Sequence, residues 1–163
     1  MESSPVNNSK NVPENAVSSV TYNSVYPHGV DEKRRVQIPA KWRPADPDTE
    51  LTVILWPHDQ AGACLRVLPP EEMQKLRRNL EAMPSSNEKA SFKRFIGSNS
   101  VQVTVDKGGR ICIPEEMARN AEITDQAILV GLIDRFEIWS PKRHENVKAA
   151  DAVIATRAFA MLE

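Results

Sequence analysis

The sequence Val30–Pro39, VDEKRRVQIP, occurs a second time at Val105–Pro114 as VDKGGRICIP. A constant shift of 75 residues, from 31 to 106, superimposes the two copies. It aligns Asp31 with Asp106, Arg35 with Arg110, Val36 with Ile111, Ile38 with Ile113 and Pro39 with Pro114. Because two copies are too few for a repeat solenoid, the pattern predicts one small module that has been duplicated.

The residues around each copy predict two strands joined by a tight turn. Before the second turn, Val101, Val103 and Val105 alternate with polar residues, as in a half-buried strand. Gly108 and Gly109 can adopt the positive φ that tight turns need. The first copy has the same order of apolar and turn residues, so each copy is predicted to form a β-hairpin.

Further elements follow each hairpin in the same order in both halves. Each copy ends in a proline, which ends a strand and suits the first turn of a helix. The buried anchors expected in the short helices are Trp42 and Met117. The predicted short helices are Ala40–Arg43 and Glu115–Asn120. The predicted strands are Leu51–Trp56, Cys64–Leu68, Ala127–Leu132 and Phe136–Trp139. The predicted longer helices are Glu71–Met83, one around Phe92 and Phe95 with Ser85 as its N-cap, and Lys142–Leu162. The expected fold class is mainly β with short helices (α+β).

This order divides the chain into five segments. We expect a disordered tail at 1–20, a first module at 21–70, a helical linker at 71–99, a second module at 100–141 and a C-terminal helix at 142–163. The tail is rich in Ser, Asn, Pro and Glu, and such segments bury too little apolar area to offset their ordering entropy. Modules of about 40–50 residues have marginal cores, so packing against each other or oligomerisation is expected.

Length and composition are those of an ordinary globular protein, with 163 residues, 40% hydrophobic and 26% charged. No apolar run approaches the roughly 18 residues of a membrane span. The polar N-terminus lacks the apolar stretch of a secretory signal, so the cytoplasm is the expected location. The formal net charge of -1 argues against a protein that coats nucleic acid with its whole surface, but it permits a local basic patch.

The first turn and the residues after it carry such a local excess of positive charge. Residues 30–43 contain five basic and two acidic side chains, a net charge of +3, and residues 106–110 have a net charge of +1. Basic side chains on a projecting hairpin are one way into a DNA groove. The alternative is that each aspartate pairs with its arginine across the turn and that the other charges are solvated. The two arrangements are compatible if the aspartate orients the arginine.

The reactive side chains form no recognisable catalytic or metal site. Cys64 lies in an apolar run and Cys112 in a predicted strand, so both are expected to be buried, reduced thiols. With His28, His58 and His144 they are too scattered for a zinc site. No nucleophile–base arrangement is recognisable. The sequence therefore favours neither an enzyme, nor a cofactor, nor a small-molecule substrate.

The duplicated Asp–Arg hairpin followed by Ile-Pro resembles the swapped-hairpin fold of AbrB-like transition regulators and MazE-like antitoxins. Two copies in one chain, separated by a helical segment, look specifically like the MraZ family. These are bacterial DNA-binding transcriptional regulators of the division and cell-wall gene cluster. Further matching stretches are CLRVLP at 64–69, the helix around FKRF at 92–95 and ILVGLIDRFEIWSP at 128–141. The resemblance runs from about Tyr22 to Pro141.

The resemblance implies two tandem swapped-hairpin modules in one pseudo-twofold unit, and a ring-shaped homo-oligomer that binds double-stranded DNA and is associated with the nucleoid. Arg34 occupies a position where the family usually has glycine, and a non-glycine residue at positive φ costs on the order of 1 kcal/mol. Because the second turn has glycines there, the first hairpin is expected to be the main reader. The DNA-binding residues that the resemblance implies are Lys33, Arg35, Lys107 (one position earlier in its turn) and Arg110, with Asp31 and Asp106 orienting them. Arg34 is added to the predicted DNA-binding residues because of its charge.

Other functions remain open at this point. An antitoxin-like module would share the fold and bind a protein toxin as well as DNA, although such proteins usually have one hairpin module and a disordered C-terminal arm. A purely structural or partner-binding ring would need no basic turn. An enzyme would need a reactive arrangement that this sequence does not display.

Overall fold

The computed structural model describes residues 20–163, so the predicted tail lies outside the described residues apart from Val20. The strands are β1 (Val25–Gly29), β2 (Arg35–Gln37), β3 (Leu51–Trp56), β4 (Cys64–Leu68), β5 (Ser100–Val103), β6 (Arg110–Cys112), β7 (Gln126–Gly131) and β8 (Phe136–Trp139). The helices are η1 (Ala40–Trp42), α1 (Pro70–Ala82), α2 (Asn87–Ser98), α3 (Glu115–Asn120), α4 (Pro141–Phe159) and η2 (Ala160–Leu162). The α+β class predicted from the sequence is confirmed.

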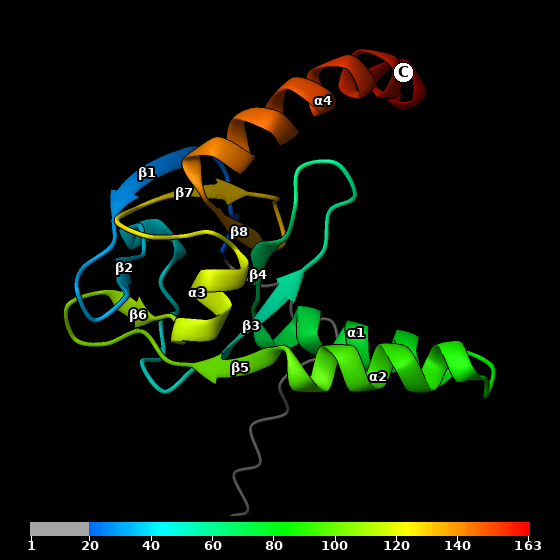
Figure 1. Cartoon of the computed structure of the whole chain (residues 1–163), viewed down its shortest axis with the longest axis horizontal. Coiled ribbons are helices and arrows are strands. Elements are labelled where there is room, and N and C mark those ends of the chain that lie inside the picture. Colours follow the sequence, from blue (N-terminus) through cyan, green and yellow to red (C-terminus); the bar gives the residue numbers. More distant parts are fainter. Residues whose placement is uncertain (1–19) are drawn as a thin grey trace, which may run out of the picture.

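The strands form two antiparallel sheets that are shared by the two halves of the chain (Figure 1). Six strands lie in the order β1-β7-β8-β4-β3-β5, and β2 pairs with β6 separately. This order is symmetric, because exchanging each strand with its counterpart in the other half reverses it. As a result β1 of the first half pairs with β7 of the second, and β5 of the second half pairs with β3 of the first.

Neither turn lies in the regular β-hairpin that the sequence predicted. The strands on either side of the first turn, β1 and β2, belong to different sheets and are joined by one bridge, between Val30 and Val36. The strands around the second turn, β5 and β6, also belong to different sheets. Each arm instead pairs with the other half, where β1 completes a ladder with β7 and β5 completes one with β3.

The hydrophobic core contains residues of both halves. Trp42, of η1, is fully buried, and its ring centroid lies 5.0 Å from that of Phe136 and 5.8 Å from that of Tyr22. Trp42 and Met117 were the anchors predicted for the two short helices, and both are buried. The aromatic cluster therefore ties the first short helix to β8, which belongs to the other half.

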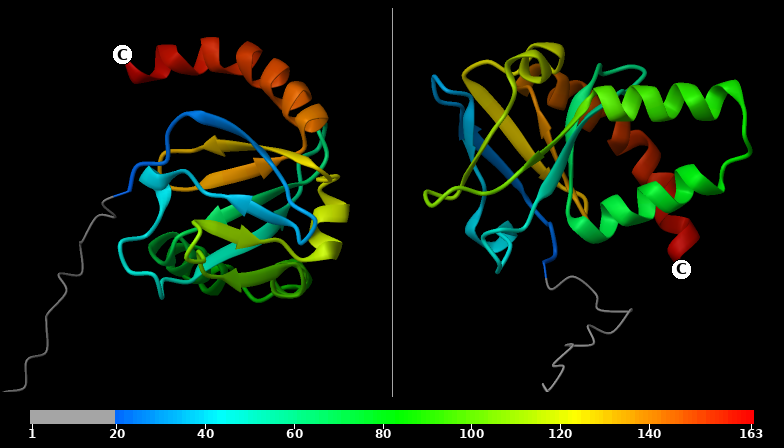
Figure 2. Two further views of the ribbon diagram at one scale, coloured as in Figure 1. Left: turned by 90° about the vertical axis from the view of Figure 1, so that its left-hand side faces the viewer. Right: turned by 90° about the horizontal axis from the view of Figure 1, so that it is seen from below.

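The longer helices extend from this core (Figures 1 and 2). Helices α1 and α2 lie side by side and project away from the end that carries the two turns. Ser86, rather than the predicted Ser85, caps α2, because its side-chain oxygen accepts a hydrogen bond from the Lys89 amide at 3.1 Å. Among the residues of α4, Val147 is buried in a second, smaller cluster with Cys64 and Trp139, and the second half of the helix is mostly exposed.

The two cysteines differ from each other. Cys64 is buried as predicted, and burial raises the pKa of its thiol. Cys112 is exposed, contrary to the prediction. It lies between Ile111 and Ile113, which both point into the core, and successive side chains of an extended segment point to opposite sides.

Between residues 20 and 163, no helix has the length and apolar character needed to cross a membrane. The same part of the chain contains no group of three or more His, Cys, Asp or Glu side chains that could hold a metal ion.

We predict that Trp42→Ala lowers the free energy of unfolding by about 3–5 kcal/mol, because it empties the centre of the aromatic cluster. Chemical denaturation should show one transition, since Trp42 contacts residues of both halves. The neighbouring exposed residue provides a control, and Lys41→Ala should change the free energy by no more than about 0.5 kcal/mol. Two separate transitions in the parent protein would contradict a shared core.

Candidate nucleic-acid interface

The first turn is held together by the carboxylate of Asp31. One carboxylate oxygen accepts hydrogen bonds from the backbone amides of Lys33 at 2.9 Å and Arg35 at 2.8 Å. The other oxygen accepts a hydrogen bond from Nε of Arg35 at 2.6 Å. The backbone closes the turn, because the Arg34 amide donates to the Asp31 carbonyl at 2.9 Å. One acidic side chain thus fixes both the path of the turn and the direction of its arginine.

The second turn repeats this arrangement around Asp106. Its carboxylate accepts from the backbone amides of Gly108 and Arg110, both at 2.9 Å, and from Nε of Arg110 at 3.2 Å. The Gly109 amide donates to the Asp106 carbonyl at 2.9 Å. The predicted pairing of each aspartate with its arginine is therefore present in both turns.

These bonds also set the charge state of the two aspartates. Hydrogen bonding by the Arg35 amide is the main cause that lowers the pKa of Asp31 below its ordinary value. The Arg110 amide does the same for the pKa of Asp106. Both carboxylates therefore stay ionised at neutral pH and continue to orient their arginines. The second arginine also reaches the first turn, with 3.9 Å between NH1 of Arg110 and Oδ2 of Asp31.

The two turns are locked to each other by backbone bonds between the halves. The Ile38 amide donates to the Gly109 carbonyl at 2.8 Å, and the Ile113 amide donates to the Arg34 carbonyl at 2.9 Å. These are equivalent bonds, because the repeat shift converts one into the other. Strands β2 and β6 pair between them, centred on Val36 opposite Ile111. The turns are consequently held at the same end of the molecule (Figure 1).

The residue at the tip of each turn has a left-handed backbone. Arg34 has φ of 60° and Gly109, its equivalent, has φ of 82°. The positive φ expected at Arg34 is therefore present. Its side chain is partly buried, because Nε donates to the Ile113 carbonyl at 3.0 Å. This bond gives Arg34 a contact within the protein that the sequence did not predict.

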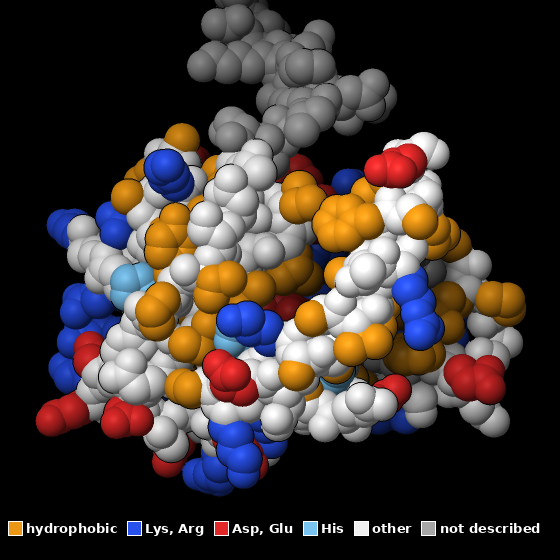
Figure 3. All heavy atoms as spheres, turned by 90° about the horizontal axis from the view of Figure 1, so that it is seen from above, with side chains coloured by type: hydrophobic (Ala, Val, Ile, Leu, Met, Phe, Trp, Pro, Cys, Tyr) orange, Lys and Arg blue, Asp and Glu red, His pale blue; other side chains and the backbone are white. Residues whose placement is uncertain are grey.

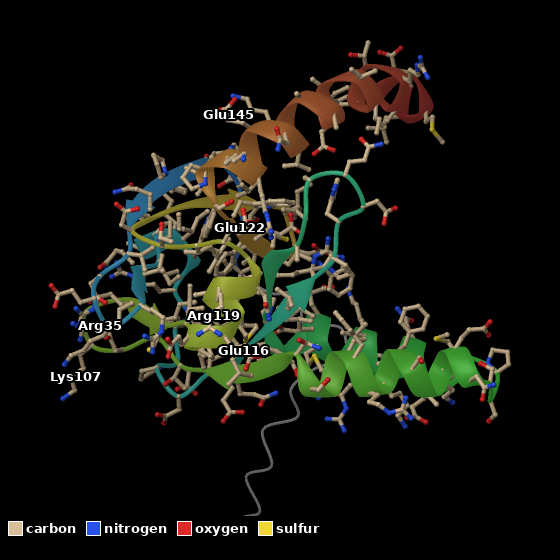
Figure 4. The ribbon with its side chains drawn as sticks, viewed as in Figure 1. Arg35, Lys107, Glu116, Arg119, Glu122 and Glu145 are labelled. Carbon is tan, nitrogen blue, oxygen red and sulfur yellow. The ribbon has the colours of Figure 1, made fainter. Side chains whose placement is uncertain are left out.

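Among the basic side chains of the two turns, the lysines are the exposed ones. Lys33 and Lys107 are both exposed, and within residues 20–163 neither ammonium group forms an ion pair. In Figure 4, Arg35 and Lys107 lie near each other at the turn end of the molecule. Basic side chains gather at that same end, on the left in Figure 3, with acidic side chains among them. This end can offer positive charge to an anionic ligand.

Comparison with known proteins finds relatives over most of the chain. A family model described as "MraZ protein, putative antitoxin-like" matches residues 96–160. A protein of Roseiflexus sp. (strain RS-1) named Transcriptional regulator MraZ is 38% identical over 126 residues, which cover 77% of this chain and 85% of that protein. The chain belongs to the MraZ family. Proteins of the same name in Halothermothrix orenii and Rickettsia rickettsii are 36% and 37% identical, over 72% and 81% of this chain and 80% and 89% of their own length.

The seven residues that the sequence singled out lie in the two MraZ turns described above. The sequence did not single out Arg43 as a site residue, although it counted its charge. Nε of Arg43 donates to the Ile38 carbonyl at 2.8 Å, and its guanidinium lies against Gly109. The one sequence feature that could have pointed to Arg43 is the glycine at position 109, which leaves space beside the second turn. Only the fold shows that Arg43 fills this space.

We predict that Asp31→Ala speeds hydrogen exchange at the Lys33 and Arg35 amides, because both amides lose their acceptor. The measurement is residue-resolved amide exchange by NMR or mass spectrometry at neutral pH. Glu32→Ala removes the same charge from the same turn and serves as the control. Equal acceleration in both variants would show that the Asp31 carboxylate does not order the turn.

Proposed function

We propose that this chain is a sequence-specific DNA-binding transcriptional regulator without enzymatic activity, and that its two turns contact double-stranded DNA. The observation that carries the proposal is the pair of exposed lysines, Lys33 and Lys107, on neighbouring turns whose arginines are already oriented by carboxylates. The names of the similar proteins, all Transcriptional regulator MraZ, support the same function.

The proposed contacts divide between lysine and arginine. A lysine ammonium binds a phosphate as a point charge. Arg35 and Arg110 use Nε on their aspartates, and their side chains remain about one-third exposed, at 33% and 34%. Their partly exposed guanidinium groups would bind a phosphate or the edge of a guanine. Because the turns are ordered before binding, little conformational entropy is lost when DNA binds.

Self-association into a ring is a further part of the proposal, supported by two exposed apolar surfaces. The first, on α2, is a hollow of about 490 Å³ whose lining includes Phe92, Phe95 and Pro57. The second is the end of the C-terminal helix, where Phe159 and Met161 are 67% and 86% exposed. Because the two surfaces differ, contact between them would join copies head to tail, and such contacts form a ring when the rotation between copies closes on itself.

A ring would explain how such small turns reach useful affinity. Each protomer offers only a few phosphate or base contacts. Several protomers on one ring can engage repeated DNA sites together, and the linked contacts raise the overall affinity. We therefore propose that the protein acts on repeated sites upstream of the division and cell-wall gene cluster, and that it is cytoplasmic and associated with the nucleoid.

We predict that the protein protects repeated sequences upstream of its own gene in a footprinting experiment, and that its affinity falls steeply with salt. Replacing Lys33 or Lys107 by alanine should make the slope of log affinity against log salt shallower by about one for each phosphate that is no longer neutralised. Lys148→Ala, on α4, removes the same charge away from the turns and is the control.

Equal slopes in all three lysine variants would reject the turns as the DNA interface. Equal affinity for one repeat and for several would reject the multivalent mechanism. Co-purification of a small ribonuclease toxin with the parent protein would favour the antitoxin-like alternative, which also binds DNA.

We also predict that Phe92→Glu with Phe95→Glu reduces the mass of the assembly in multi-angle light scattering, because charges then line the α2 hollow. Ile133→Asn is the control, since Ile133 is 73% exposed in the turn before β8. Asparagine also tolerates its φ of 72°. An unchanged mass in the double variant would remove α2 from the interface between copies.

A further inference from the structure

The two turns are equivalent in backbone but differ in how their tips are filled. In the first turn, the Arg34 side chain donates from Nε to the Ile113 carbonyl at 3.0 Å. In the second turn, the equivalent residue is Gly109 and has no side chain. The equivalent acceptor, the Ile38 carbonyl, is nevertheless occupied, because Nε of Arg43 donates to it at 2.8 Å.

Arg43 occupies the space that a side chain at position 109 would need. A Cβ placed on Gly109 would lie 2.6 Å from NH2 and 2.7 Å from Nε of Arg43, which is closer than such atoms approach. The reverse holds in the first turn. The residue equivalent to Arg43 is Ala118, which is buried and has no polar side chain to compete with Arg34. In both turns, therefore, an arginine guanidinium bonds an isoleucine carbonyl. The arginine stands at position 34 of the repeat for the first turn and at position 43 for the second.

The segment that carries Arg43 is itself placed against the second turn. A small hollow of about 140 Å³ separates them, and its lining includes Arg43, Pro44 and Pro47 on one side and Asp106 and Lys107 on the other. The two prolines restrict the backbone after Arg43. Arg43 thus reaches the tip of the second turn from a segment of restricted backbone in the other half of the chain.

We propose that Arg43 is the positioning residue of the second turn and that Arg34 is that of the first. Each guanidinium bonds the carbonyl of an isoleucine that directly follows a strand of the short sheet, Ile113 after β6 for Arg34 and Ile38 after β2 for Arg43. Arg43 then controls how Lys107 is presented, and Arg34 controls how Lys33 is presented. The claim that the lysines are presented to DNA rests on the proposed function. The claim that Arg43 takes over in the second turn the role that Arg34 has in the first, the exchange of arginine positions, does not.

The exchange is tested without DNA by a double-mutant cycle in thermal unfolding. Arg43→Ala should lower the melting temperature because the Ile38 carbonyl loses its donor. Gly109→Arg should lower it because the new side chain collides with Arg43. The double variant should recover most of both losses, since an arginine at 109 can then bond the Ile38 carbonyl as Arg34 bonds that of Ile113. Additive losses would overturn the proposal.

The positioning role is tested by coupling the arginines to the lysines in DNA binding. In the Arg43→Ala background, Lys107→Ala should no longer change the salt slope, whereas Lys33→Ala should still lower it by about one. In the Arg34→Ala background the pattern should reverse. A merely structural Arg43 would leave the effect of Lys107→Ala undiminished, which would overturn the positioning role. If neither lysine affects the slope of the parent protein, the proposed DNA interface fails, and the unfolding cycle still decides the exchange of arginines.

Discussion

The antiparallel pairing of β2 with β6 is the constraint on which the rest of the structure depends. Each strand has only three residues, and such a short pair has little stability alone. Burial stabilises it, because Val36, Ile38, Ile111 and Ile113 are at most 1% exposed. Each half supplies one strand, so the two turns are not held against each other until the two halves meet. Both copies of the duplicated sequence are therefore needed to form the paired turns as well as the core.

Differences between the two copies are most informative where the backbone is the same. Both tips require a positive φ, and both isoleucine carbonyls accept from an arginine. Arg34 combines the strained backbone with the guanidinium, whereas the second turn divides these roles between Gly109 and Arg43. A side chain in the left-handed region costs on the order of 1 kcal/mol, and a hydrogen bond to a charged group offsets a similar amount. The two solutions can therefore be close in energy.

Local patterns were sufficient to predict most elements but not their partners. Strands Leu51–Trp56, Cys64–Leu68 and Phe136–Trp139 and helix Glu115–Asn120 have the predicted bounds, because alternation and proline positions are local properties. The pairing of β1 with β7 joins distant residues, and periodicity alone carries no information about it. The exposure of Cys112 follows instead from local alternation, because Ile111 and Ile113 on either side of it are buried. The aspartate and arginine of each turn were predictable because they lie four residues apart, whereas Arg43 reaches its turn from the other half.

The charge available at the surface is smaller than the sequence suggests. Residues 30–43 have a net charge of +3, but Lys41 and Arg43 lie beyond the turn, and residues 31–35 have a net charge of +1, equal to that of residues 106–110. Within the first turn, Arg34 bonds a backbone carbonyl and Arg35 bonds Asp31. One freely exposed lysine then remains in each turn, Lys33 and Lys107. That the first turn is the main reader stays a prediction. Two turns of similar charge on a chain of net charge -1 suit weak contacts that are strengthened by repetition rather than one strong contact.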